Sequence, residues 1–345
     1  MKEYRSIDLF KFICAVLIII LHTAPFASYS KVLTFGLRHI VTTIAVPFFF
    51  AASGFLTAKK LATFASEIDK NKYMKRFSLR LVVMYCIWSA IYFGFVIYKW
   101  YLLEDFSYLN IIEYIKDFFF EGSYLTIWFL PALLMAQVLV FLLNKKFSYK
   151  KIFIFAIPVY AFTLLGSSYY QITLNVGFLK LIFDTYYSFF DTIKNGVCFG
   201  FIYVALGAWI SQADDKISRR SMKSDIVWIC IFWILLAIEE VATASWENRG
   251  CDTQMMLVPL TYFVISALLK IELPEHSIYT SLRKYSLLMF LCQRIPLSII
   301  ELFLSKTILY TNSMLFFVVT MISTLVISFV VIKLSTKYKI LKHMY

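Results

Sequence analysis

Long apolar stretches separated by short polar segments run along the whole chain of 345 residues. Most of them are roughly 20 residues long, the length of helix that crosses a hydrocarbon core about 30 Å thick. The apolar residues are continuous rather than alternating, which is typical of membrane helices. The pattern therefore predicts an all-α fold, a polytopic membrane bundle of about ten transmembrane helices. The expected spans are 9–27, 40–58, 79–98, 125–143, 152–169, 196–211, 225–242, 253–270, 284–304 and 313–333.

The composition of the chain supports this class. Hydrophobic residues make up 61% of the sequence and charged residues 16%, whereas soluble domains are about 45–50% apolar and about 25% charged. No linker or low-complexity segment divides the sequence, so we treat residues 1–345 as a single transmembrane domain. The first span also has the pattern of a signal peptide. His22 interrupts its apolar run and many spans follow, so we expect it to be retained.

The net charge of +13 follows the expected membrane topology. If the N-terminus lies in the cytoplasm, ten spans return the C-terminus to the same side, and most Lys and Arg residues fall in cytoplasmic segments, as the positive-inside rule requires. The largest segment on the opposite side, 99–124, is acidic. We therefore expect cytoplasmic termini, the lipid bilayer as a partner, and no nucleic acid. The basic cytoplasmic segments are 59–80, 145–151, 216–223 and 333–342.

The first expected span carries ionisable residues that packing alone does not explain. Arg5, Asp8 and Lys11 follow one another at intervals of three residues, and His22 lies eleven residues after Lys11. Eleven residues make three helical turns, so Lys11 and His22 share one face, about 16 Å apart along the axis. Ionisable groups in membrane spans usually face a cavity or a partner. His22 is thus a candidate general base, with a histidine hydrogen-bonded inside the bundle as the alternative.

A second candidate lies near the middle of the ninth span, where Arg294 follows Gln293 and precedes Glu301 by two helical turns. An arginine at this depth has to be paired or face water. We expect either an ion pair between Arg294 and Glu301 or a role in substrate binding for Gln293 and Arg294. Arg294 would suit a carboxylate, because a guanidinium matches its two oxygens.

Other polar residues have a structural and a functional interpretation. The basic segment before the third span, with Arg76 and its neighbours, would contact anionic lipid or hold the phosphates of a nucleotide-bearing donor. Ser53 in the second span indicates close helix packing, and Trp128 indicates packing or a stacking wall. Glu239 and Glu240 end the seventh span, and we expect them at the outer surface.

The six cysteines indicate neither a disulfide set nor a metal centre. Five lie in apolar segments and no Cys-x-x-Cys pair occurs, so we interpret them as small hydrophobic residues. The sequence also lacks a phosphate-binding Walker loop, a nucleophile elbow and a zinc-binding His-Glu-x-x-His motif. We expect no metal and no permanently bound cofactor. The cysteines are Cys14, Cys86, Cys198, Cys230, Cys251 and Cys292.

These features, in this order, resemble the acyltransferase-3 family of bacterial membrane proteins. The likeness is closest to the membrane half of the VanT-type serine racemases, whose soluble racemase domain has no counterpart in these 345 residues. It covers nearly the whole chain. It rests on Asp8, Lys11 and His22 and on the segments 46–56 (VPFFFAASGFL), 127–134 (IWFLPALL), 194–207 (KNGVCFGFIYVALG) and 290–300 (FLCQRIPLSII).

The resemblance implies a ten-span module that moves an acyl group, often acetyl, from cytosolic acyl-CoA to a sugar or another acceptor destined for the cell surface. The family pattern of a basic residue, ten others and a histidine corresponds to Lys11 and His22. Three positions depart from the family pattern. Lys11 stands where arginine is usual, and Thr126 and Gln293 stand where histidines are common.

We therefore predict a multi-pass acyltransferase of the bacterial cytoplasmic membrane, with acyl-CoA as donor substrate and a surface glycan or envelope precursor as acceptor. The alternatives are a small amino-acid (serine-like) transporter module and a catalytically inactive partner in an envelope complex, and assembly into a homo-oligomer stays open. The expected site residues are His22, Asp8 and Lys11 for catalysis, Arg5, Lys75, Arg76 and Arg80 for the phosphates of the donor, and Gln293, Arg294, Trp128 and Ser53 for the substrate.

Overall fold

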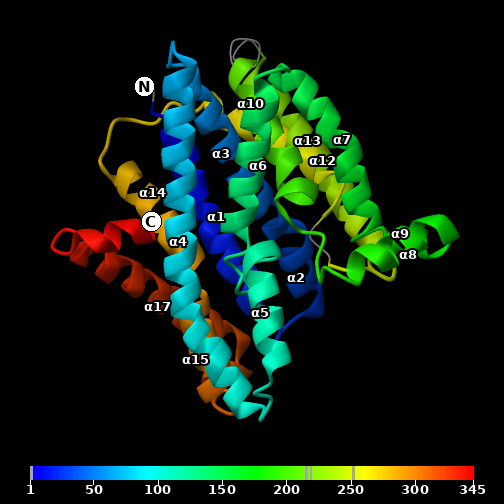
Figure 1. The fold of residues 1–345 in the computed structure, drawn as a ribbon, viewed down its shortest axis with the longest axis vertical. Coiled ribbons are helices and arrows are strands. Elements are labelled where there is room, and N and C mark those ends of the chain that lie inside the picture. Colours follow the sequence, from blue (N-terminus) through cyan, green and yellow to red (C-terminus); the bar gives the residue numbers. More distant parts are fainter. Residues whose placement is uncertain (1–2, 214–216, 218–219, 251–252) are drawn as a thin grey trace. The chain divides into compact units, whose positions relative to one another are not determined.

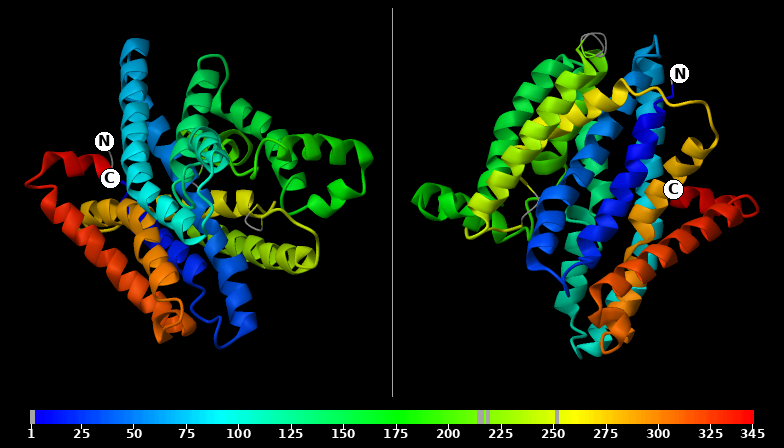
Figure 2. Two further views of the ribbon diagram at one scale, coloured as in Figure 1. Left: turned by 60° about the horizontal axis from the view of Figure 1, so that its bottom comes forward. Right: turned by 180° about the vertical axis from the view of Figure 1, so that it is seen from behind.

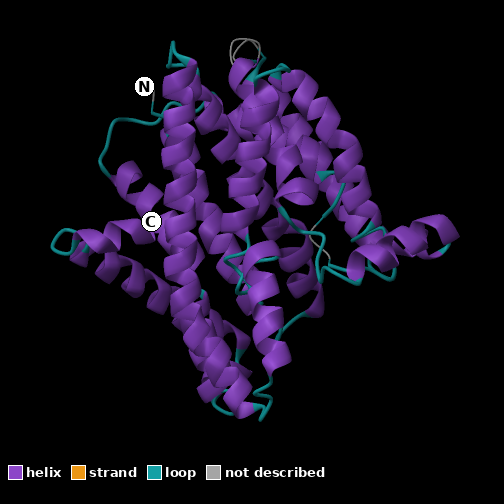
Figure 3. Cartoon of the chain, in the orientation of Figure 1, coloured by secondary structure: helices purple, strands orange, loops and turns teal. Residues whose placement is uncertain are grey.

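The computed structural model describes residues 3–213, 217, 220–250 and 253–345. Over these residues the chain forms helices joined by turns and loops, without a strand (Figure 1, Figure 3). The expected all-α class is confirmed. Cys251 and part of the basic segment 216–223 lie outside the described residues.

Each of the ten expected spans falls on helix. Within the described ranges, six helical segments are long and apolar enough to cross a membrane, namely Arg5–Thr23, Lys31–Leu61, Glu67–Leu102, Met222–Thr243, Ile278–Phe303 and Ser313–Leu334. The other four expected spans fall on shorter helical segments, which are α6 (Phe129–Asn144), α7 (Tyr149–Leu165), Gly196–Gln212 and α13 (Leu257–Leu269). The chain is a helical, multi-pass membrane protein, and the number ten and the side on which the termini lie stay predictions.

Two compact units divide the chain. Unit 1 comprises Met1–Ile7, Val46–Leu79 and Pro131–Leu273, and unit 2 comprises Asp8–Ala45, Arg80–Leu130 and Pro274–Tyr345. Helices α1 (Arg5–Thr23) and α4 (Glu67–Leu102) contribute residues to both units.

Unit 1 is built on the crossing of α3 (Ala45–Leu61) and α10 (Phe201–Gln212). A Cβ added to Gly54 would overlap the carbonyl oxygen of Val204, and one added to Gly207 would overlap that of Ala51. Only glycine lets the two backbones approach this closely. Helices α7 and α13 pack on α10, and α12 (Met222–Thr243) lies along α13 (Figure 1). The unit is completed by α6, α8 (Tyr170–Leu174), α9 (Gly177–Tyr187) and the π-helical turn η3 (Gly196–Gly200).

A buried carboxylate caps α13 in unit 1. Glu239 accepts hydrogen bonds from the backbone N–H groups of Met255 at 2.6 Å and Met256 at 3.0 Å and from the Tyr169 hydroxyl at 2.6 Å. The first N–H groups of a helix lack partners within it, and a negative charge there is favourable. Our expectation that Glu239 and Glu240 are exposed is wrong, since only 9% and 4% of their surfaces are accessible. The side of the membrane on which they lie stays a prediction.

Unit 2 contains most of α1 and the helices that follow residue 277. Helix α17 (Ser313–Leu334) packs against α14 (Ile278–Cys292) and α15 (Arg294–Phe303), and both views of Figure 2 show α17 beside them. The other elements of this unit are α2 (Lys31–Phe35), η1 (Gly36–Val41), η2 (Thr42–Ile44), α5 (Tyr108–Phe120), α16 (Ile308–Thr311) and η4 (Lys339–Met344).

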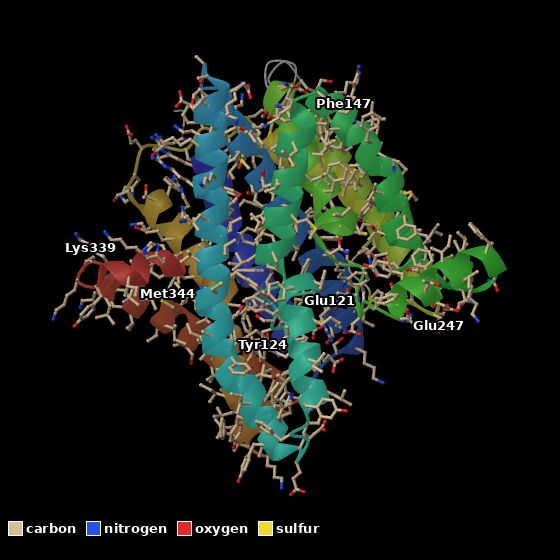
Figure 4. All side chains as sticks on the ribbon, viewed as in Figure 1. Glu121, Tyr124, Phe147, Glu247, Lys339 and Met344 are labelled. Carbon is tan, nitrogen blue, oxygen red and sulfur yellow. The ribbon has the colours of Figure 1, made fainter. Side chains whose placement is uncertain are left out.

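Tyrosines of α4 fix the loop that follows α5 in unit 2. The Tyr85 hydroxyl donates to the carbonyl oxygen of Phe118 at 2.7 Å and accepts from the N–H of Ser123 at 2.9 Å. Tyr92 stacks on Tyr124, which Figure 4 labels, with ring centroids 4.6 Å apart and ring planes 6° from parallel. The acidic segment expected to be an external loop therefore contains a helix and is held by hydrogen bonds and ring stacking.

Candidate functional site

Helix α1 presents the residues expected to be catalytic. Asp8, Lys11 and His22 all belong to unit 2, and α1 is uninterrupted between them. Lys11 and His22 are half-buried, and His22 lies in the last turn of the helix. The structure therefore keeps Lys11 and His22 three turns apart on one helix, as their spacing predicts.

Asp8 has a charged partner that the sequence did not single out. The Asp8 carboxylate is 4% exposed, and its Oδ2 accepts from the Nη2 of Arg283 at 2.8 Å and from its Nε at 3.0 Å. Arg283 lies on α14 and its side chain is half exposed. The contact ties the start of α1 to α14, three residues before Lys11. The partners are 275 positions apart in the sequence, so no local pattern indicates this contact.

Gln293 and Arg294 lie at the junction between α14 and α15 in unit 2. The expected pairing of Arg294 with Glu301 is confirmed, with Nη2 and Oε2 3.4 Å apart. The Gln293 Nε2 donates to the carbonyl oxygen of Phe290 at 3.1 Å. Gln293 Oε1 and Arg294 Nε are nevertheless among the buried polar atoms that lack a hydrogen-bond partner within the described residues, and so is Thr126 Oγ1. These groups have the capacity to bind a ligand, since buried polar atoms are costly when unpaired.

Tyrosines that sequence reasoning missed hold this junction. The Tyr92 hydroxyl donates to the carbonyl oxygen of Leu291 at 2.5 Å. The Tyr124 and Ser298 hydroxyls are 2.8 Å apart. Because Tyr92 and Tyr124 also stack, α4 and the loop after α5 both support the turn that bears Gln293. Aromatic residues are common throughout this chain, so no sequence signal marked these two.

Trp128 and Ser53 have packing roles in different units. In unit 2 Trp128 is half-buried, and its backbone packs directly on Gly122. A φ of +102° and this close contact both favour glycine at position 122. In unit 1 the Ser53 Oγ accepts from the Nε2 of Gln137 at 2.9 Å. Gln137 is buried, which the apolar context of α6 did not indicate. Trp128 and Ser53 therefore both have packing contacts, and a role of either residue in substrate binding stays a prediction.

The basic residues expected to bind phosphates are divided between the units. Arg5 and the exposed Lys75 and Arg76 belong to unit 1, and the exposed Arg80 belongs to unit 2. Arg5 donates from Nη1 to the carbonyl oxygen of Leu273 at 3.0 Å. The Arg5 guanidinium thus has a backbone partner within unit 1. The side chains of Lys75, Arg76 and Arg80 on α4 are exposed.

A cavity of about 760 Å³ lies within unit 1, and none of the expected site residues lines it. It lies where α3, α6 and α10 end and where α4 and α7 begin. Its lining residues are Ala58, Lys59, Leu61, Ala62, Glu67, Lys70, Asn71, Phe141, Asn144, Lys145, Tyr149, Ser211 and Gln212.

Comparisons with known proteins cover almost the whole chain. Residues 4–333 match an acyltransferase domain, that of the acyltransferase-3 family. An amino-acid racemase of Enterococcus faecalis is 32% identical over 220 residues, which are 64% of this chain and 30% of that protein. A second Enterococcus faecalis amino-acid racemase is 23% identical over 338 residues, and a serine/alanine racemase of Enterococcus gallinarum is 21% identical over 339 residues. These two alignments cover 98% of this chain and 47% of each relative. The chain thus spans less than half the length of these relatives, and no solved structure matches it.

Proposed function

The chain belongs to the acyltransferase-3 family, and we propose that it transfers an acyl group, in the first place acetyl, at the bacterial cytoplasmic membrane. The donor is cytosolic acyl-CoA, and the acceptor is a hydroxyl or amine of a cell-surface carbohydrate or envelope precursor. One observation carries the proposal. The matched residues 4–333 include a half-buried histidine, His22, within an apolar helix that also carries Lys11. Ten spans with cytoplasmic termini belong to the same proposal.

In this mechanism His22 is the general base. Its neutral imidazole takes the proton of the acceptor hydroxyl or amine, and the acceptor atom attacks the carbonyl carbon of the thioester. The new bond from the acceptor to this carbon forms, the carbon–sulfur bond breaks, and the proton passes to the leaving CoA thiolate. An imidazole suits this role because it gains and loses a proton near neutral pH.

The donor is held through its phosphates. We assign this attraction to Arg5 and Lys11 and to the surface charges of α4, Lys75, Arg76 and Arg80. Asp8 orders the charged start of α1 through its contact with Arg283. Lys11 binds phosphate as a point charge, because an ammonium lacks the two-pronged geometry of a guanidinium.

The acceptor and the developing oxyanion are assigned to the junction in unit 2. Arg294 Nε and Gln293 are groups with unused hydrogen-bonding capacity there. Arg294 Nε is a donor, and a donor stabilises a developing negative charge when it lies about 3 Å from it. The unpaired atom of Gln293 is Oε1, an acceptor, which suits the hydroxyl or amine of the acceptor substrate. Trp128 supplies an apolar wall there. Ser53 belongs to unit 1 and stays a separate candidate for the substrate, beside the hydrogen bond that its Oγ accepts from Gln137.

Ligand binding to the purified protein in nanodiscs tests the proposal. We expect acetyl-CoA to bind, and His22→Ala to retain this binding because the imidazole acts on the acceptor. His343→Ala, which removes an exposed histidine, is the matched control. If folded wild-type protein does not bind acetyl-CoA at millimolar concentrations of this ligand, acetyl-CoA is excluded as the acyl donor.

The second candidate is a transporter module for a small amino acid. It is favoured by relatives that are named amino-acid racemases and by the buried Arg294, whose guanidinium suits a carboxylate. Binding of L-serine without binding of acetyl-CoA would support it, and an Arg294→Met variant should then lose serine. Binding of neither compound would favour a catalytically inactive envelope partner, in keeping with Thr126 and Gln293 at positions where the family commonly has histidine.

A further inference from the structure

A groove with an almost wholly apolar lining lies in unit 2, where α1, α14 and α17 come together (Figure 2). Its volume of about 400 Å³ falls within the range of about 300–1,000 Å³ that is usual for small-molecule sites. Val326 and Phe329 are exposed, so the groove opens to the surroundings of the three helices. Its lining residues are Phe12, Leu282, Tyr285, Leu325, Val326 and Phe329.

The surroundings of this groove are lipid. All three helices belong to segments that are long and apolar enough to cross a membrane, and the outer faces of such helices contact acyl chains. A ligand with many polar groups would lose its hydrogen bonds to water against this lining. An acyl chain has no such groups and gains dispersion contacts with the lining. The groove therefore fits the acyl chain of a membrane lipid.

A lysine at the end of α17 lies beside the groove. The Lys333 ammonium is 5.8 Å from the ring centroid of Phe329, which is a lining residue. Lys333 is exposed and has no acidic partner within the residues that the structure describes. Lysines near the ends of membrane helices extend their charge towards the interface, where lipid headgroups lie. The groove thus combines an apolar lining with a cation at its edge.

Arg283 supplies a second cation close to the groove. It follows the lining residue Leu282, and its Nη2 lies 2.8 Å from Oδ2 of Asp8. Asp8 precedes the lining residue Phe12 by one helical turn. Half of the Arg283 side chain is exposed, so the guanidinium offsets the charge of Asp8 and still faces the surroundings. Since this pair is neutral as a whole, the charge of Lys333 makes the edge of the groove positive.

We propose that this groove binds an acidic phospholipid, with an acyl chain along the apolar lining and the phosphate at Lys333. A zwitterionic headgroup gains less from the Lys333 ammonium, because its own cation offsets the phosphate. Anionic lipids of the cytoplasmic leaflet attract basic residues next to membrane helices, and the segment 333–342 is one of those expected on the cytoplasmic side. The inference goes beyond acyl transfer and does not depend on it.

The chain provides a matched control for each part of the site. The Lys337 ammonium is 5.4 Å from the ring centroid of Tyr338, so Lys337 has the same kind of ring contact beside a residue that does not line the groove. Val326 and Val330 are both exposed on α17, and only Val326 lines the groove. Lys333→Gln and Val326→Trp therefore alter the site, whereas Lys337→Gln and Val330→Trp leave it intact.

The test is native mass spectrometry of the full chain, released from detergent that contains equal amounts of phosphatidylglycerol and phosphatidylcholine. We expect wild type to retain phosphatidylglycerol in preference to phosphatidylcholine. Lys333→Gln should weaken phosphatidylglycerol binding about fivefold and leave phosphatidylcholine binding unchanged. Lys337→Gln should change either by less than about twofold. Val326→Trp should lower the binding of both lipids because its indole fills the groove, and Val330→Trp should not.

Three results would overturn the proposal, each in protein whose thermal unfolding without added lipid shows that it is folded. The first is the absence of a preference for phosphatidylglycerol in wild type. The second is equal weakening in Lys333→Gln and Lys337→Gln, which would indicate a general attraction of the basic segment to anionic lipid. The third is a dimer without retained lipid that Val326→Trp dissociates, which would assign the groove to a second copy of this chain.

Discussion

Both units bury polar side chains, and two places differ in how these are satisfied: the Glu239 cap of α13 in unit 1 and the Gln293–Arg294 junction in unit 2. In unit 1 the buried carboxylate of Glu239 uses both oxygens, which accept from two backbone N–H groups and from the Tyr169 hydroxyl. In unit 2 the buried Gln293 and Arg294 each make a contact and still leave an atom without a hydrogen bond among the described residues. An unpaired buried polar atom costs about 1–3 kcal/mol, so the Gln293–Arg294 junction keeps a cost that the Glu239 cap avoids.

This difference indicates where ligand chemistry belongs. Polar groups whose hydrogen-bonding capacity is fully used stabilise the fold. Groups with unused capacity can form further hydrogen bonds when a ligand binds. The unused groups of unit 2 share that unit with His22, and the Ser53–Gly54 sequence of unit 1 is explained by packing.

Replacement of Gly207 or Gly54 by alanine should give the largest loss of stability. Each added methyl group would overlap a backbone carbonyl across the α3–α10 crossing, and overpacking of this kind costs about 3 kcal/mol. Thermal unfolding in detergent measures it. Gly94→Ala is the control, because no atom lies within 4 Å of its added Cβ. It should be neutral or stabilise α4 by up to about 1 kcal/mol, and equal losses at Gly94 and Gly207 would refute the packing account.

Removal of the Arg283 side chain should have the next largest effect. Arg283→Met leaves the buried Asp8 carboxylate without this partner, and we expect a loss of about 2 kcal/mol, less than for a fully buried pair because Arg283 is half exposed. Lys284→Met, at an exposed neighbour, should change stability by less than about 0.5 kcal/mol. In the Asp8→Asn/Arg283→Met double variant the losses should not add. If the two single-variant losses in the free energy of unfolding add exactly in the double variant, the Asp8–Arg283 contact does not contribute to stability.

Replacement of Ser53 by alanine should have the smallest effect. It leaves the Nε2 of buried Gln137 without its acceptor, at a cost of about 1 kcal/mol. Gln137→Met removes the partner, so Ser53→Ala should cost less in that background. The packing interpretation predicts an unchanged rate of acyl transfer in Ser53→Ala. A clear loss of rate at preserved stability would instead assign Ser53 to the substrate.

Local features of the fold could be predicted from the sequence. The ten apolar windows fall on helix because a run of apolar residues in a membrane has to satisfy its own backbone. The Arg294–Glu301 pair follows from two helical turns on one face. Lys11 and His22 lie on one uninterrupted helix, and their spacing of eleven residues corresponds to three helical turns.

Contacts between distant segments could not be predicted. Asp8 and Arg283 are 275 residues apart and Ser53 and Gln137 are 84 apart, so no periodicity relates them. The sequence wrongly predicted that Glu239 is exposed, because a carboxylate at the end of an apolar run is typical of the membrane–water interface. Its partners at Met255 and Met256 exist only once α12 and α13 pack together.

If His22 is the general base of acyl transfer, the rate of CoA release from acetyl-CoA depends on its imidazole. Wild type, His22→Ala and the control His343→Ala would be compared in nanodiscs with a panel of sugar and amine acceptors. The account predicts acceptor-dependent CoA release by wild type and the control, reduced about 10²–10⁴-fold in His22→Ala. Release by His22→Ala at the wild-type rate would contradict it.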